Sequence, residues 1–232
     1  MSVHITKTYN IGGLIGLRQN AVKNAGETLG FKEMSLFKFP DAYDSDDELH
    51  VRMDGIIASL CPEDIVIFQH PSGESPRYDG FLFEHLRRYH GTKIVAFIQE
   101  IASDRDDSEY SLSDEITLLN RADMFIFASA ALRDYYIANG LEEKPYLSQA
   151  VQDYVTDICV NEHKNKKLYI MAETSQNEYP LDNLNIEVVR YDEYRATESI
   201  LRLSDGGFGL IWDGDEQALG LYMAAGIRVI VK

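Results

Sequence analysis

Short, almost continuously apolar runs alternate along the chain with longer segments in which apolar residues recur every three or four positions. Residues 64–69 (DIVIFQ) form the clearest run, which is typical of a central parallel strand buried on both faces. Residues 14–30 have helical spacing and end at a glycine, which predicts a helix with a C-terminal cap. Five such strand–helix repeats fill the first 140 or so residues. We therefore expect an α/β fold with a doubly wound parallel sheet.

The alternation predicts a first Rossmann-like unit over residues 1–145. Its other expected strands are residues 3–8, 34–39, 93–99 and 124–128, and its other expected helices are residues 45–60, 80–90, 113–121 and 130–139. Residues 146–166 are expected to form a linker, because this stretch is polar and ends in EHKNKK.

Residues 167–232 are expected to form a second, incomplete Rossmann-like unit. Its expected strands are residues 167–171, 186–190, 207–212 and 228–231, and its expected helices are residues 193–203 and 216–225. The last strand has no covering helix, so apolar surface would be left exposed. Such surface usually contacts another chain, which predicts a homo-oligomer.

The charge of the chain excludes several function classes. Its 232 residues include 38 acids and 22 bases, for a formal net charge of −16. Nucleic acid and anionic lipid both favour clustered Lys and Arg, and the longest basic cluster here is Lys164, Lys166 and Lys167. We expect no nucleic-acid partner and no charge-driven membrane binding.

Targeting and metal signals are missing from the sequence. No apolar run approaches the ~20 residues of a membrane helix, and the N-terminal residues MSVHITKTYN do not resemble a signal peptide. Cys61 and Cys159 follow no metal-ligand spacing, and core thiols are favoured over a single disulfide. We expect a cytoplasmic protein without a metal site.

A glycine-rich turn, NIGGLIG at residues 10–16, follows the first strand and opens the first helix. Gly12 and Gly13 would let the backbone approach a phosphate or a sugar there. The dinucleotide fingerprint G-x-G-x-x-G needs glycine at position 11, which is Ile11. A dinucleotide-dependent reductase, with Asp41 after the second strand, is therefore the weakest alternative. A tight turn without a ligand explains the glycines equally well.

Polar residues follow the third and fourth strands, at the edge where α/β sheets bind ligands. His70 and Ser72 lie in the first of these loops, and Gln99 and Glu100 lie in the second. His70 or Glu100 could act as a base or bind a sugar hydroxyl, although loop residues of both types are common without such a role. Asp213 and Asp215 form a D-x-D pair, which in some nucleotide-sugar enzymes holds a divalent ion on the phosphates, but a turn followed by helix-capping acids is the better interpretation.

Four phrases of the sequence resemble one known family. They are LHVRMDGIIASLCPEDIVIFQHPS (49–72), KIVAFIQEI (93–101), LNRADMFIFAS (119–129) and GGFGLIWDGDE…LYMAAGIRVIV (206–231). They are similar to the glucosyltransferase 3 family, or nucleotide-sugar-synthetase-like proteins, of accessory-secretion loci in streptococci and lactobacilli. The resemblance implies a GT-B fold, self-association, and transfer of a hexose from a UDP-sugar to N-acetylglucosamine on serine-rich repeat adhesins. The first unit would then hold the acceptor and the second the donor.

The sequence departs from the family pattern at three places. Gln99-Glu100 replaces a histidine-aspartate pair, and residues 172–177 (AETSQN) replace a Gly/Asn-rich turn that carries an arginine. Residues 217–220 (QALG) replace a tyrosine-lysine pair near the donor phosphates, and the family's last strand and helices are absent. Thr174, Ser175, Asn177, Asp213 and Asp215 are left as weak donor-side candidates.

The loss of cations decides between two hypotheses. Two missing cationic contacts and the added Glu173 would weaken binding of a UDP diphosphate by ~10³-fold or more. The favoured hypothesis is a glycosyltransferase-like pseudoenzyme with a degenerate UDP-sugar site, acting as a non-catalytic subunit or glycan-binding partner of an active transferase. The alternative is an active hexosyltransferase that uses a UDP-sugar as its donor and needs no other cofactor, with Glu100 or His70 orienting the acceptor.

Overall fold

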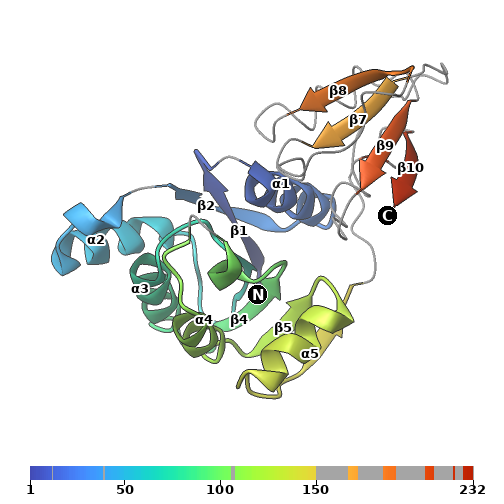
Figure 1. The fold of residues 1–232 in the computed structure, drawn as a ribbon. Helices are drawn as coiled ribbons and strands as arrows, with labels where there is room; N and C mark the ends of the chain where they lie inside the picture. Colours follow the sequence, from blue (N-terminus) through green and yellow to red (C-terminus); the bar gives the residue numbers. More distant parts are fainter. Residues whose placement is uncertain are drawn as a thin grey trace. The chain divides into compact units, whose positions relative to one another are not determined.

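The computed structural model describes residues 1–11, 13–38, 40–105, 108–149, 167–171, 185–191, 207–211, 222 and 227–231 (Figure 1). The chain divides into two compact units, the first over Met1–Ile11 and Arg18–Ala150 and the second over Gly12–Leu17 and Val151–Lys232. Each unit contains a parallel β-sheet, which confirms the expected fold class.

The first unit has a six-stranded sheet in the order β2-β1-β3-β4-β5-β6, with every pair parallel. Its strands are β1 (Val3–Tyr9), β2 (Lys32–Phe37), β3 (Ile65–His70), β4 (Lys93–Ile98), β5 (Met124–Phe127) and β6 (Tyr146–Ser148). The sequence pattern did not predict β6 and placed it in the linker. All three of its residues are exposed, so it lacks the apolar run that marks the other strands.

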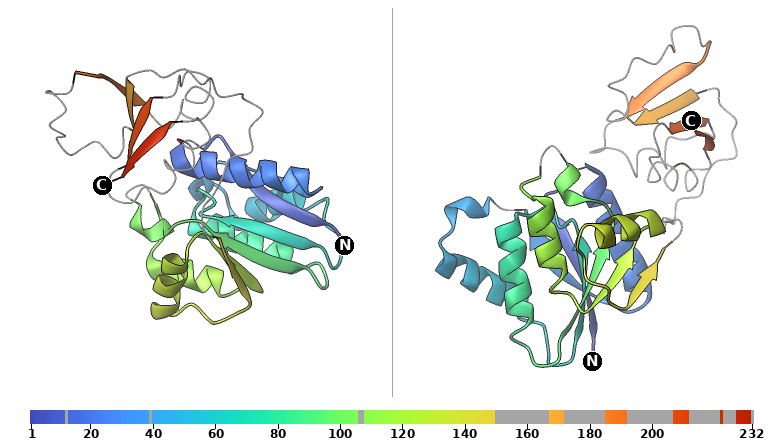
Figure 2. Two further views of the ribbon diagram at one scale, coloured as in Figure 1. Left: turned by 90° about the vertical axis from the view of Figure 1, so that its right-hand side faces the viewer. Right: turned by 60° about the horizontal axis from the view of Figure 1, so that its bottom comes forward.

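Five helices connect these strands. They are α1 (Gly13–Thr28), α2 (Asp46–Ile56), α3 (Pro76–Leu86), α4 (Leu112–Leu119) and α5 (Ala130–Ala138), with short 3₁₀ turns at Asp41–Tyr43 and Ala102–Asp104. Helix α1 covers one face of the sheet, and α3 to α5 lie on the other (Figure 2). Serine begins α2 to α5, because each serine hydroxyl at the N-cap accepts a hydrogen bond from a backbone N–H of the first turn.

The core of the first unit lies between the sheet and α2 to α5. Strand β3 contributes Val66 and Phe68, which are fully buried, and α3 contributes Leu82 and Phe83. The rings of Phe68 and Phe83 pack edge to face with centroids 4.9 Å apart. Cys61, expected in the core, is instead exposed in the turn before β3, so that prediction was wrong.

The second unit has a four-stranded sheet in the order β10-β9-β7-β8. Its strands are β7 (Lys167–Met171), β8 (Glu187–Tyr191), β9 (Phe208–Ile211) and β10 (Arg228–Val231), at the positions expected from the sequence. The helices expected at 193–203 and 216–225 lie outside the described residues, apart from Tyr222, which is helical. The Tyr222 ring packs directly against Gly209, where no side chain would fit.

Arg228 is a charged residue at the start of β10. Its guanidinium lies over the Phe208 ring on the neighbouring strand, 5.7 Å from the ring centroid, which is a cation–π geometry.

Among the described helices, none combines the length and the apolar character needed to cross a lipid bilayer.

Replacing Phe83 by alanine would remove a fully buried ring from the centre of this core. We expect the Phe83→Ala variant to lose about 3–5 kcal/mol of unfolding free energy, measured by urea denaturation. Val51 on α2 is 73% exposed, so Val51→Ala should change the same quantity by less than about 0.5 kcal/mol. Equal losses in the two variants would contradict this account of the core.

Candidate functional site

The loops after β1, β3 and β4 come together at the carboxyl edge of the first sheet. The chain leaves β1 toward β2 on one side and leaves β3 toward β4 on the other, so β1 and β3 flank the topological switch point, where α/β sheets bind ligands. Gly73 has φ +84°, and a Cβ there would overlap the side chain of Ile11. The two loops at the switch point are therefore in direct contact.

Three buried glutamines link these loops. The Gln99 side chain donates to Gln69 Oε1 (2.8 Å), and Gln69 donates to the backbone oxygens of Thr6 and Gln19. Gln19 on α1 in turn donates to the carbonyls of Pro71 and Ser72. Gln99, an acceptor-side candidate from the sequence, is thus 6% exposed and connects strands β3 and β4.

Glu100 lies at the mouth of this edge between two arginines. Its Oε2 accepts a hydrogen bond from Arg18 Nη1 on α1 at 2.5 Å, and its Oε1 accepts one from Arg105 Nη1 at 3.1 Å. The Glu100 side chain is 19% exposed. The three groups carry a net charge of +1 at neutral pH, in a chain whose net charge is −16. Neither arginine was identified from the sequence.

His70 is fully buried at the end of β3 and does not face solvent. Its Nε2 donates to Glu115 Oε1 on α4 at 2.6 Å. Glu115 also accepts hydrogen bonds from the Tyr136 hydroxyl on α5 and from the backbone N–H groups of Ala102 and Ser103. Burial alone would raise the pKa of Glu115, but His70, Tyr136 and Ala102 together lower it from 4.5 to about 2.

Ser72 belongs to a second buried network, with Asp79 on α3 and Tyr110. The hydroxyls of Ser72 and Tyr110 both donate to Asp79 Oδ2, at 2.6 and 2.7 Å. Asp79 Oδ1 is buried without a hydrogen-bond partner among the described residues. Burial therefore outweighs the two hydroxyls and raises the pKa of Asp79 from 3.8 to about 6. This loop after β3 is held by a carboxyl group that titrates near neutral pH.

The partner residues of both networks were missed by the sequence analysis, although one signal was present. Glu115 occupies a position on α4 among Leu112, Ile116 and Leu119, where an apolar residue is expected. A charged residue on an apolar helix face needs a buried partner, and His70 provides it. Nothing in the spacing of Asp79, Tyr110 and Tyr136 connects them to this edge.

The structure describes only some of the other candidate residues from the sequence. Gly13 is the first residue of α1, while Gly12, Thr174, Ser175, Asn177, Asp213 and Asp215 lie outside the described residues. Asp41, the acid of the reductase alternative, is buried and accepts a hydrogen bond from the Ser75 hydroxyl at the start of α3. Its carboxylate therefore serves the fold.

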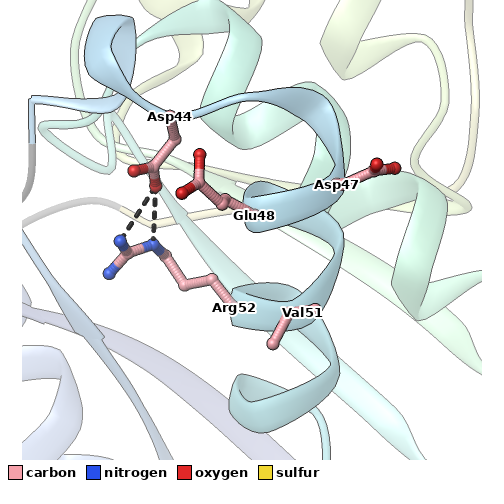
Figure 3. Close-up of a pocket in the computed structure, with 5 residues that line it drawn as sticks. All are labelled: Asp44, Asp47, Glu48, Val51 and Arg52. Carbon is pink, nitrogen blue, oxygen red and sulfur yellow. Dashed lines mark hydrogen bonds and ion pairs between the residues drawn. The ribbon is translucent and has the colours of Figure 1, made fainter.

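A hollow of about 510 Å³ lies beside the first turns of α2 (Figure 3). It is lined by Asp44, Asp47, Glu48, Val51 and Arg52. Arg52 donates to Asp44 Oδ2 from Nε and Nη2, at 3.2 and 2.9 Å. Three carboxylates against one paired guanidinium would repel a phosphate group. The carboxyl edge of the sheet remains the better candidate for a ligand site.

Replacing Glu115 by glutamine tests the His70 network. Because its pKa is lowered, Glu115 stabilises the fold above pH 4.5, and this contribution is lost as the pH falls toward 2. We expect Glu115→Gln to reduce the unfolding free energy by about 3 kcal/mol at pH 7, with a difference that shrinks between pH 4.5 and 2. The exposed Glu109 gives the control variant, Glu109→Gln. A difference that stays constant with pH would contradict the assignment.

Comparison with known proteins agrees with this architecture. Residues 2–151 match a family model described as "Glucosyltransferase 3-like, N-terminal domain". Two full-length matches are named Glucosyltransferase 3: one from Streptococcus gordonii is 31% identical and one from Streptococcus parasanguinis is 29% identical. Each match covers 100% of this chain and 79% of the relative.

Solved structures with a similar fold are also glycosyltransferases. An alpha-glucosyltransferase in complex with UDP has a TM-score of 0.57 at 12% identity, covering 100% of this chain and 80% of that one. An alpha-glucosyltransferase in complex with UDP and a 13-mer DNA has a TM-score of 0.59 at 12% identity, covering 100% and 79%. At these identities the similarity shows a GT-B-like fold alone. By the family match and the two relatives that align with the whole of this chain, the chain is a glycosyltransferase-like protein that belongs to the glucosyltransferase 3-like family.

Proposed function

We propose that this chain takes part in the O-glycosylation of serine-rich repeat adhesins in the cytoplasm, as a non-catalytic subunit or glycan-binding partner of an active transferase. The observation that carries the proposal is the engagement of Glu100. It stands where the family resemblance places a histidine-aspartate pair, and Arg18 and Arg105 bind both of its carboxylate oxygens. Uptake of a proton by Glu100 would compete with these two charge-assisted hydrogen bonds, which disfavours Glu100 as a general base. His70 is no substitute, because it is buried.

The sequence of the donor-side segments supports the same proposal. Residues 172–177 and 217–220 contain one acid and no base. A UDP diphosphate carries about two negative charges, and each missing charge-assisted contact would remove roughly 1.5–3 kcal/mol of binding free energy. A degenerate UDP-sugar site follows from this loss, and the chain would need no cofactor of its own.

An acceptor glycan is the ligand that the described edge suits best. Tyr9 and Phe37 are the last residues of β1 and β2, and their rings stack with centroids 5.4 Å apart and an interplanar angle of 26°. They are 37% and 57% exposed. Aromatic faces pack against the apolar face of a sugar ring. Arg18, Glu100 and Arg105, farther along the same edge, offer hydrogen-bonding groups for hydroxyls elsewhere on the glycan. The same exposed aromatic pair is available for self-association.

An active hexosyltransferase is the second candidate. It is favoured by the two relatives that align with the whole of this chain, which are named Glucosyltransferase 3 and are 31% and 29% identical. In this case Glu100 would orient the acceptor hydroxyl, and a UDP-hexose would be the donor.

A transfer assay separates the two candidates. The purified protein is mixed with UDP-glucose or UDP-galactose and a serine-rich peptide that carries N-acetylglucosamine, with and without Mg²⁺ or Mn²⁺. We expect no transfer, and calorimetric titration should show UDP binding no tighter than millimolar. Hexose transfer that Glu100→Gln abolishes would overturn the proposal in favour of the active enzyme.

Binding of the same glycopeptide tests the acceptor edge. We expect Phe37→Ala to weaken binding by about tenfold, since stacked aromatic contacts are worth roughly 0.5–1.5 kcal/mol beyond their buried area. The matched control is Tyr43→Ala, because Tyr43 is an aromatic residue that is 86% exposed outside the stacked pair. Unchanged binding in Phe37→Ala, or equal weakening in both variants, would exclude the Tyr9–Phe37 pair as part of the site.

A further inference from the structure

Two histidines and two acids gather between helices α2 and α3, on a part of the first unit that the proposed function does not use. His50 and Asp54 lie on α2 one turn apart, and Glu84 and His85 lie on α3. The two helices pack against each other (Figure 1). Ligand atoms of His50, Glu84 and His85 all lie within 4.8 Å of one another. The sequence predicts no metal site, and these four residues are separated along the chain.

The hydrogen bond of one ring nitrogen fixes the tautomer of His85. Its Nδ1 lies 2.8 Å from the backbone carbonyl oxygen of Phe81, which can only accept, so Nδ1 carries the proton. In the neutral ring the lone pair is then on Nε2. Most metal-binding histidines have this arrangement, with one nitrogen donating to a carbonyl or carboxylate and the other facing the metal. His85 is fully buried, so its ring cannot turn away from this orientation without disturbing the core.

Two atoms near His85 Nε2 lie at the separation of neighbouring zinc ligands. His50 Nδ1 lies at 3.3 Å and Asp54 Oδ1 at 3.5 Å from it. Zinc bonds to nitrogen and oxygen are about 2.0–2.1 Å long, so neighbouring ligands of a tetrahedral ion are about 3.3–3.4 Å apart. The two imidazoles therefore already have the separation that a shared ion requires.

A cationic side chain lies beside the same groups. Arg88 approaches His50 Nδ1 and Asp54 Oδ1, each at 3.2 Å, and Glu84 Oε1 at 3.4 Å. This cluster therefore already attracts positive charge. The Arg88 side chain is 44% exposed, so it can move into solvent when another cation takes its place.

We propose that His50, Glu84 and His85 bind a divalent ion of the zinc class, with Asp54 as the nearest further acid. Two imidazole nitrogens and carboxylate oxygens match the preference of Zn²⁺, whereas Mg²⁺ and Ca²⁺ favour oxygen ligands alone. The ion would join α2 to the last turn of α3. The proposed ion site is about 15 Å along α3 from Ser75. Ser75 lies at the end of the loop after β3, so the ion site is separate from the carboxyl edge of the sheet.

Calorimetric titration of the purified full chain with Zn²⁺ tests the proposal, with Mg²⁺ as the comparison ion. We expect one saturable Zn²⁺ site with micromolar affinity and no comparable Mg²⁺ site. Replacing a ligand in His50→Gln should weaken Zn²⁺ binding by at least about tenfold. Arg88→Ala should strengthen it, because the competing cation is removed. His90→Gln, which changes an exposed histidine outside the cluster, should leave the affinity unchanged.

Three results would overturn the proposal. One is the absence of saturable Zn²⁺ binding, which would mean that the two imidazoles and Arg88 form only a hydrogen-bonded surface network. Another is full retention of the site in His50→Gln, which would place the ion elsewhere on the chain. The third is weaker binding in Arg88→Ala. His50 is only partly buried, so the His50→Gln variant is expected to fold. Circular dichroism of the variants checks that any loss of Zn²⁺ binding is not caused by unfolding.

Discussion

Four segments of the first unit are held together by one buried carboxylate. Glu115 on α4 accepts hydrogen bonds from the end of β3, from α5 and from two backbone N–H groups after β4. A buried charge without such donors costs several kcal/mol. Each donor segment therefore has to be in place for the others to be stable. The hydrogen bonds to Glu115 therefore help to fix the loops after β3 and β4 at the carboxyl edge of the sheet.

Glu115 and Asp79 show how the number of donors decides the state of a buried acid. Both side chains are fully buried, but four groups donate to Glu115 and two to Asp79. The pKa of Glu115 is about 2 and that of Asp79 about 6. One carboxylate is thus permanently charged near the edge of the sheet, while the other changes its charge within the physiological range. Desolvation raises the pKa of both acids, and the difference comes from the hydrogen bonds to Glu115 together with its charge attraction to His70.

The strands could be predicted because a strand that is buried on both faces needs a nearly continuous run of apolar residues. Strands such as β3 and β4 are apolar along most of their length, whereas β6 is exposed and left no such trace. Helix α3 was expected from residue 80 but begins at Pro76. Ser75-Pro76 is the start signal, with an N-cap residue followed by proline at the first helical position.

The candidate site was only half predictable for a physical reason. The position of Gln99 and Glu100 at the sheet edge follows from the parallel topology alone. Their partners do not, because Arg18 and Glu100 are separated by 82 positions, and His70 and Glu115 by 45. Such pairs depend on how helices pack on the sheet, and no local spacing encodes that. The five donor-side candidates lie outside the described part of the chain and stay predictions; they are Thr174, Ser175, Asn177, Asp213 and Asp215.

The two outer strands of the six-stranded sheet have a consequence for how copies of this chain can associate. Strand β6 is three residues long, and β2, the outermost strand on the other side among the described residues, begins with Lys32 and Glu33. A very short edge strand and charged side chains both discourage backbone pairing with another sheet. Neither side is therefore a good template for continuous intermolecular β-structure. Assembly of this unit should depend on side-chain surfaces, and the folded state should resist growth into fibrils.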